Sequence, residues 1–119
     1  MTIHHHKDLR VWNEAVRLGV MTHHLVEKLS APHQIAYGSQ MRRAAVSVGA
    51  NIAEGAARHY PKEFVQHLYT SRASAAELHT EFVILGECGL YLPAQLVKID
   101  DSIDHISRML TRMIRRLSS

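Results

Sequence analysis

Apolar residues recur at intervals of three and four along four long stretches of the chain. No stretch alternates between apolar and polar residues as a half-buried strand does. The 3–4 spacing places the members of each set along one side of a helix, where they can pack against neighbouring helices. These seam residues are Val11, Ala15, Leu18, Thr22, Leu25 and Leu29; Met41, Ala45, Val48, Ile52 and Gly55; Phe64, Leu68, Ser71, Ala75, Leu78, Phe82, Leu85 and Gly89; and Leu96, Ile99, Ile103, Ile106, Leu110, Met113 and Leu117.

Proline and glycine mark the ends of the predicted helices. Pro32 breaks the first periodic stretch, and we expect residues 34–39 to form a loop or an entry turn. Pro61 suits the first turn of a helix, while Gly89 and Pro93 mark a stop followed by a start. The predicted helices cover about 9–29, 36–58, 61–87 and 93–117.

The links between these helices are short, so neighbouring helices must run antiparallel. We therefore predict an all-α fold, an antiparallel up-down-up-down four-helix bundle that forms a single domain over residues 1–119, with residues 1–7 flexible. The residues expected in the core or at an interface are Trp12, Val16, Met41, Ile52, Phe64, Leu78, Phe82, Ile103 and Leu110.

The second predicted helix is built almost entirely from small residues. Beside its seam runs a second row of small or apolar positions, Val46, Ala50, Ala53 and Ala57. A helix that is apolar over most of its circumference is normally covered over most of it. Either this helix lies deep inside the bundle, or part of it is buried against another subunit.

Polar residues remain on a narrow line of the same helix, and a buried polar group is costly without a partner. Arg43, Asn51 and Glu54 belong to this line, and the next helix offers Thr70, Ser74 and Glu77 as candidate partners. We interpret Arg43, Asn51, Glu54 and Glu77 as a structural polar cluster that fixes helix register. A ligand site is the alternative interpretation.

Charge is distributed unevenly along the last helix. The chain has a formal net charge of +3, and three acids at 100, 101 and 104 precede the arginines Arg108, Arg112, Arg115 and Arg116. This order matches the helix dipole and a solvated surface. The same order is equally compatible with a stripe of arginines that contacts phosphates. Arg58 is a further candidate for such contacts. Of the four tyrosines that could stack on bases, we expect only Tyr60 to lie near an arginine, because it follows Arg58 by two residues.

No motif for catalysis, phosphate binding or metal coordination is present, and we expect no catalytic residue, no cofactor and no metal site. The ten histidines are scattered, and those such as His67 are interpreted as isolated surface residues. His4–His6 are either native or part of an added tag. The absence of a membrane-spanning run and of a signal segment predicts a cytoplasmic protein without membrane contact.

Four segments resemble the four-helix bundle proteins encoded in intervening sequences of 23S rRNA. They are KDLRVWNEAV (7–16), SQMRRAAVSVGANIAEG (39–55), KEFVQHL (62–68) and ASAAELHTEF (73–82). The resemblance implies a homopentamer around a central channel, a basic surface implicated in nucleic-acid binding, and no established enzymatic activity. The family is related to the accessory variability determinant of diversity-generating retroelements, which makes a reverse transcriptase a conceivable protein partner.

Two functions follow from these observations. The first is a homo-oligomeric accessory protein that binds the backbone of RNA or DNA through its basic residues. The second is a scaffold that contacts only proteins.

Overall fold

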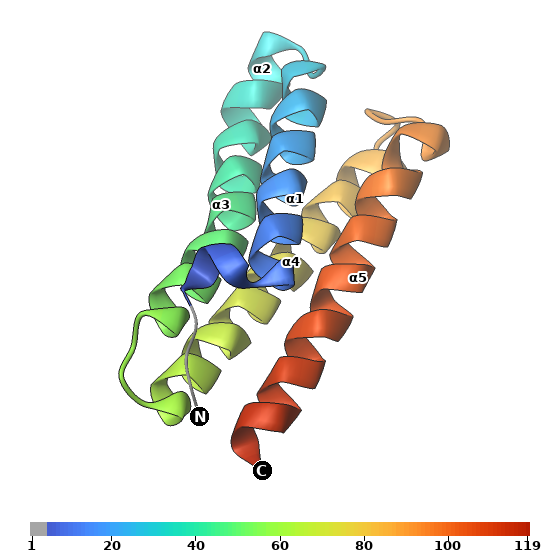
Figure 1. Cartoon of the computed structure of the whole chain (residues 1–119). Coiled ribbons are helices and arrows are strands. Elements are labelled where there is room, and N and C mark those ends of the chain that lie inside the picture. Colours follow the sequence, from blue (N-terminus) through green and yellow to red (C-terminus); the bar gives the residue numbers. More distant parts are fainter. Residues whose placement is uncertain (1–4) are drawn as a thin grey trace.

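The computed structural model describes residues 5–119, and they form a bundle of four long helices (Figure 1). Consecutive long helices run in opposite directions, and the bundle measures 47 × 21 × 19 Å. No strand occurs in the described part of the chain, which confirms the predicted all-α fold. The elements are η1 (His6–Asp8), α1 (Arg10–Glu27), α2 (Ala31–His33), η2 (Gln34–Gly38), α3 (Ser39–Ala56), α4 (Pro61–Glu87) and α5 (Pro93–Ser118).

The helix lengths follow the predicted stretches, with differences at both ends of the chain. Residues 1–4, which include His4 and most of the segment predicted to be flexible, lie outside the described residues. The remaining part of that segment contributes to a single 3-10 turn, η1. The last helix continues one residue beyond the predicted end, to Ser118.

The seam residues form the core. Every seam residue of α1 and α3 is buried, and so is every one of α4; Gly89, in the turn after α4, is exposed. Only the ends of the α5 seam are half-buried, at Leu96, Met113 and Leu117. Most of the predicted core list is therefore confirmed, since Met41, Ile52, Phe64, Leu78, Phe82, Ile103 and Leu110 are all buried.

Two residues of that list lie elsewhere. Trp12 is half-buried and packs against the core from outside. Val16 lies on the surface of the protomer with 44% of its area exposed, so it is not a core residue. Its position one residue away from the seam residue Ala15 turns its side chain out of the bundle. The other part of that prediction, that Val16 belongs to an interface, stays a prediction.

The segment between α1 and α3 is helical, so of the two alternatives predicted for 34–39 the loop is wrong and a turn that enters the next helix is present. Pro32 occupies the first turn of α2, where a missing backbone N–H costs no hydrogen bond, so it begins a helical segment instead of only ending one. The π-turn η2 then leads directly into α3. The Gln34 side chain donates from Nε2 to the Leu29 carbonyl over 2.9 Å, which satisfies an acceptor after α1.

Tyr91 fastens the turn between α4 and α5 to the end of α1. Its hydroxyl donates to the Leu25 carbonyl, and its ring lies 5.8 Å from that of Phe82 between centroids. Only 3% of Tyr91 is exposed, and burial raises the pKa of its hydroxyl to about 12. The turn itself needs Gly89, whose φ of 77° is costly for other residues.

Replacing Tyr91 by Phe is expected to cost about 0.5–1.5 kcal/mol at pH 8, because one buried hydrogen bond is lost. An unfolded tyrosine ionises near pH 10, whereas the folded hydroxyl keeps its proton up to about pH 12. The folded state then binds more protons, so stability falls as pH rises through this window. Urea unfolding should show the advantage of the wild type at pH 8 disappearing between pH 10 and 12. A constant difference would contradict the assignment.

Candidate nucleic-acid interface

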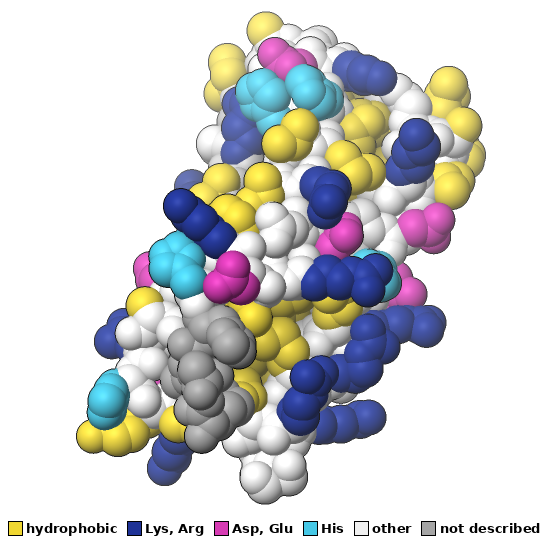
Figure 2. Space-filling model, in the orientation of Figure 1, with side chains coloured by type: hydrophobic (Ala, Val, Ile, Leu, Met, Phe, Trp, Pro, Cys, Tyr) yellow, Lys and Arg dark blue, Asp and Glu magenta, His cyan; other side chains and the backbone are white. Residues whose placement is uncertain are grey.

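The arginines of α5 lie on the side of the helix that is left free by the core. Arg108, Arg112 and Arg115 are four and three residues apart, a spacing that places them on one side of the helix. Together with Ser107 and Thr111 they line an open groove of about 510 Å³. Figure 2 shows Lys and Arg side chains gathered along the C-terminal part of this helix.

Most of these charges have no acidic neighbour. Arg108 forms an ion pair of 3.0 Å with Asp104, but both side chains are mostly exposed and the pair is screened by water. Within residues 5–119, no carboxylate lies within 4.0 Å of Arg112, Arg115 or Arg116. Asp104 is the last acidic side chain of α5, so the arginines that follow it are balanced on this helix only in part, by the negative end of the helix dipole.

A second, smaller groove extends this surface to the start of α1. It has a volume of about 210 Å³ and lies between the first turn of α1 and the last turns of α5. Arg10, Arg112 and Arg116 surround it, and its other lining residues are apolar: Leu9, Val11, Met109 and Met113. The basic surface therefore continues from one helix to the other.

Arg72 of α4 joins the same surface from the other side. Its Nη1 donates to Thr111 Oγ1 over 3.1 Å, and Thr111 lines the first groove. Sequence reasoning missed Arg10 and Arg72, because neither belongs to a basic run and only helix packing brings them to α5. We use the term arginine face for the set Arg10, Arg72, Arg108, Arg112, Arg115 and Arg116.

Arg58 lies apart from the arginine face. It is exposed in the turn between α3 and α4 and lines neither groove. The structure thus gathers four of the five arginines proposed from the sequence and separates the fifth.

Hydrogen bonds between α3 and α4 centre on Asn51. Its Nδ2 donates to the Ser47 carbonyl and hydroxyl over 2.9 and 3.0 Å, and its Oδ1 lies 3.1 Å from His67 Nδ1. Because that amide oxygen can only accept, Nδ1 of His67 carries the hydrogen. The Ser47 hydroxyl also contacts the Ser74 hydroxyl at 2.8 Å. These bonds connect facing turns of the two helices and define their register.

The composition of this polar cluster differs from the predicted one. Glu54 lies at the edge of the cluster. Its Oε2 is 3.7 Å from His67 Nδ1, and 62% of the Glu54 side chain is exposed. Arg43 and Glu77 are exposed, and within residues 5–119 no hydrogen bond or ion pair connects them to the cluster or to each other. Glu77 instead faces Glu81, whose pKa is raised by burial first and by this like charge second.

His67 is the member that sequence reasoning overlooked, whereas Ser74 was among the candidate partners expected on the next helix. The interpretation of His67 as an isolated surface histidine is wrong, because it is half-buried and bonded to Asn51. A signal was available: residues 67 and 74 are seven apart and so lie on one side of α4.

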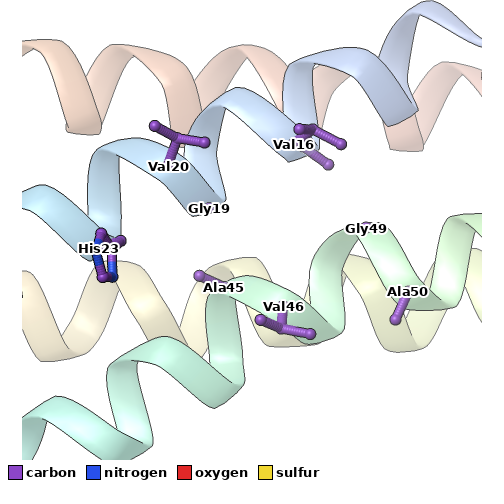
Figure 3. Close-up of a pocket in the computed structure, with 9 residues that line it drawn as sticks. Val16, Gly19, Val20, His23, Ala45, Val46, Gly49 and Ala50 are labelled. Carbon is purple, nitrogen blue, oxygen red and sulfur yellow. The ribbon is translucent and has the colours of Figure 1, made fainter.

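An apolar groove runs between α1 and α3 on the outside of the bundle (Figure 3). It measures about 380 Å³. Val16, Val20 and Val46 are exposed beside it, Val46 by 66%. Small residues form the rest of the lining, namely Ala15, Gly19, Ala45, Gly49 and Ala50, with His23 at one end. A Cβ on Gly49 would lie 3.6 Å from the Ala15 Cβ, so the two helices approach closely here.

The exposure of the second row of small residues on α3 distinguishes between the two explanations proposed for it. Val46, Ala50 and Ala57 of the second row are exposed and Ala53 is half-buried. The row is therefore not covered inside the protomer, and the first explanation, deep burial of this helix within the bundle, is wrong. The groove and the arginine face lie on different helix pairs, α1–α3 and α4–α5 for the most part.

Residues 5–119 contain no group of three or more His, Cys, Asp or Glu side chains that could hold a metal ion. Cys88 is free and exposed at the end of α4. None of the helices in this part of the chain is both long and apolar enough to cross a membrane.

Comparison with known proteins places the fold and its sequence in a family. A comparison with curated proteins found no match. A family model described as 23S rRNA-intervening sequence protein matches residues 7–112, which include all four long helices except the last turns of α5. The chain therefore belongs to the 23S rRNA-intervening sequence protein family.

Proposed function

We propose that this protein is a non-catalytic, cytoplasmic accessory protein that assembles with copies of itself and binds the backbone of RNA or DNA through the arginine face. The observation that carries the binding is the uncompensated charge of that surface. Three helices contribute guanidinium groups to it, and of its six arginines only Arg108 has a carboxylate within 4.0 Å among residues 5–119. Guanidinium groups in this density attract phosphates and release condensed counterions.

Recognition through this surface should depend little on base sequence. The arginine face is an open surface on the outside of α5, and the helix lies against α1 and α4 on its other side. Contacts to phosphates fix the position of a nucleic acid but do not read its bases. The description of the family names no reaction, which agrees with a protein that works by binding.

Self-assembly is supported by the apolar groove between α1 and α3. A ring requires two different contact surfaces on each protomer. The second contact surface is available at the end of the bundle where α4 joins α5. There four apolar side chains are exposed, Val83, Ile84, Leu92 and Val97. Hydrophobic side chains are visible at this end in Figure 2. We propose that this end of one copy packs into the α1–α3 groove of the next. The number of five subunits rests on the family resemblance.

Assembly of this kind would leave the C-terminal half of α5 free. The groove lies on α1 and α3, whereas the second apolar surface lies at the opposite end of α5 from Arg112 and Arg115. Several arginine faces in one particle would add their fields and raise the affinity for a polyanion.

Affinity at several salt concentrations tests the binding function. Fluorescence anisotropy with labelled RNA and DNA should give an affinity that falls steeply between about 50 and 200 mM salt. The variant with both Arg112→Ala and Arg115→Ala should bind more weakly and lower the salt slope by about 2, one per lost phosphate contact. The variant with Arg17→Ala and Lys28→Ala removes two exposed charges of α1 and its C-cap and should change little.

Absence of binding at low salt would contradict the nucleic-acid function. The exposed α1–α3 groove would then favour the second function, a scaffold that contacts only proteins, of which a reverse transcriptase is one candidate.

A further inference from the structure

Tyr69 lies beside the arginine face and is held there by a chain of contacts. The guanidinium carbon of Arg72 lies 5.0 Å from the centre of the Tyr69 ring, a cation–π arrangement. The same guanidinium donates to Thr111 Oγ1, and Thr111 in turn donates to the Ser107 carbonyl. Arg72 is therefore held between α5 and the ring of Tyr69.

This aromatic ring remains accessible. Tyr69 is 46% exposed on α4, and Thr111 lines the groove that holds Arg108, Arg112 and Arg115. One guanidinium separates the exposed ring from that groove. The pair thus places an exposed aromatic ring, with a guanidinium group over it, at the edge of a cationic surface.

The other tyrosines do not have this environment. Tyr37 lies near His33 at the opposite end of the bundle, and Tyr60 packs edge-on against His59 in the turn after α3. Tyr91 is buried. The expectation from the sequence that only Tyr60 lies near an arginine is wrong, because Tyr69 and Arg72 are three residues apart and lie on one side of α4. Among residues 5–119, Tyr69 is the tyrosine with a cation–π contact to an arginine.

A flat aromatic surface next to a phosphate-binding groove distinguishes between forms of nucleic acid. Bases in a duplex are stacked on each other and are unavailable to a side chain on the protein surface, whereas unpaired bases can stack on tyrosine or on a guanidinium plane. Such stacking adds to backbone contacts without reading the base sequence.

We propose that the arginine face takes a single strand, with its phosphates along Arg108, Arg112 and Arg115 and one unpaired base stacked on the Tyr69–Arg72 pair. This inference rests on the proposed function, because it names the form of nucleic acid that the same surface binds. Duplexes bind to the arginines alone, so their affinity does not depend on Tyr69.

The test compares four labelled probes of about 20 units with the full-length protein at low salt: oligouridine, oligothymidine, an abasic strand and a blunt duplex. Tyr69→Ala is expected to weaken binding of oligouridine, oligothymidine or both by about 10-fold. The same variant should bind the abasic strand and the duplex as the wild type does, since these probes offer phosphates without accessible bases. If Tyr69→Ala weakens binding of oligouridine alone or of oligothymidine alone, the proposal is supported for RNA or for DNA, respectively.

Two control variants separate stacking from other effects. Tyr69→Phe keeps the ring and should keep the affinity, whereas Tyr37→Ala removes an exposed tyrosine at the other end of the bundle and should change nothing. Equal loss with all four probes, or no loss with any, overturns the single-strand inference while leaving backbone binding in place. If the wild type binds none of the probes, the proposed function itself is wrong.

Discussion

The variant Val46→Asp is expected to run as a single protomer where the wild type runs as an oligomer. Val46 is 66% exposed in the protomer and lines the α1–α3 groove. A carboxylate there would be buried without a partner when a second copy packs into the groove, which costs several kcal/mol per contact. In the isolated protomer the same carboxylate faces water, so the fold should survive.

Sedimentation velocity and circular dichroism measure the two properties separately. Val46→Asp should reduce the sedimentation coefficient to that of the protomer and leave the helical signal unchanged. Gln40→Asp provides the matched control, because it places the same charge on an exposed position of α3 outside the groove and in the first turn, where the helix dipole favours an acid. If Val46→Asp assembles as the wild type does, the groove is not the contact surface.

The substitution with the largest expected effect on protomer stability is Gly55→Val. Gly55 is buried near the end of α3, and a Cβ there would lie 2.7 Å from Phe64 Cδ1 and 2.8 Å from His67 Cβ. His67 Cβ is bonded to the backbone of α4 and the Phe64 ring is buried, so relief requires the two helices to move apart. We expect a loss of about 1–3 kcal/mol and a melting temperature lower by about 5–15 °C.

Gly19→Ala is the control for the effect of replacing a helical glycine. Nothing lies within 4 Å of a Cβ at Gly19, so alanine should stabilise α1 by up to about 1 kcal/mol. Because Gly19 lines the α1–α3 groove, both substitutions are best measured in the Val46→Asp background, where assembly does not contribute to stability. A melting temperature that Gly55→Val leaves unchanged would show that α3 and α4 do not approach so closely.

The helical periodicity predicted the core well because burial in a bundle repeats with the helix. The seam residues of α1 and α3 all lie inside, including the polar Thr22 and the small Gly55, since position on the helix and not residue type decides burial here. The segment 31–38 could not be predicted from spacing alone. Pro32 is compatible both with a loop and with the first turn of a helix. Only the packing of Gly38 against Val26 distinguishes these two conformations.

The candidate sites were predictable only in part. The α5 arginines are four and three residues apart, so their common surface follows from helix geometry. Arg72 and Tyr69 are three residues apart on α4, so their pairing follows from helix geometry, but the contact of Arg72 with Thr111 depends on how α4 and α5 pack. The spacing of residues 67 and 74 likewise places both on one side of α4, whereas the contact of His67 with Asn51 depends on how α3 and α4 pack. Spacing predicts which residues share a side of a helix, and packing decides which residues of another helix they meet.

The central claim is that the α1–α3 groove is covered by a second copy of this chain. The mass of the unmodified protein in solution tests it most directly. Light scattering over a wide range of protein concentrations should give several times the protomer mass of 13.5 kDa, and about five times that mass for the ring that the family resemblance implies. A mass of 13.5 kDa at every concentration would contradict the claim.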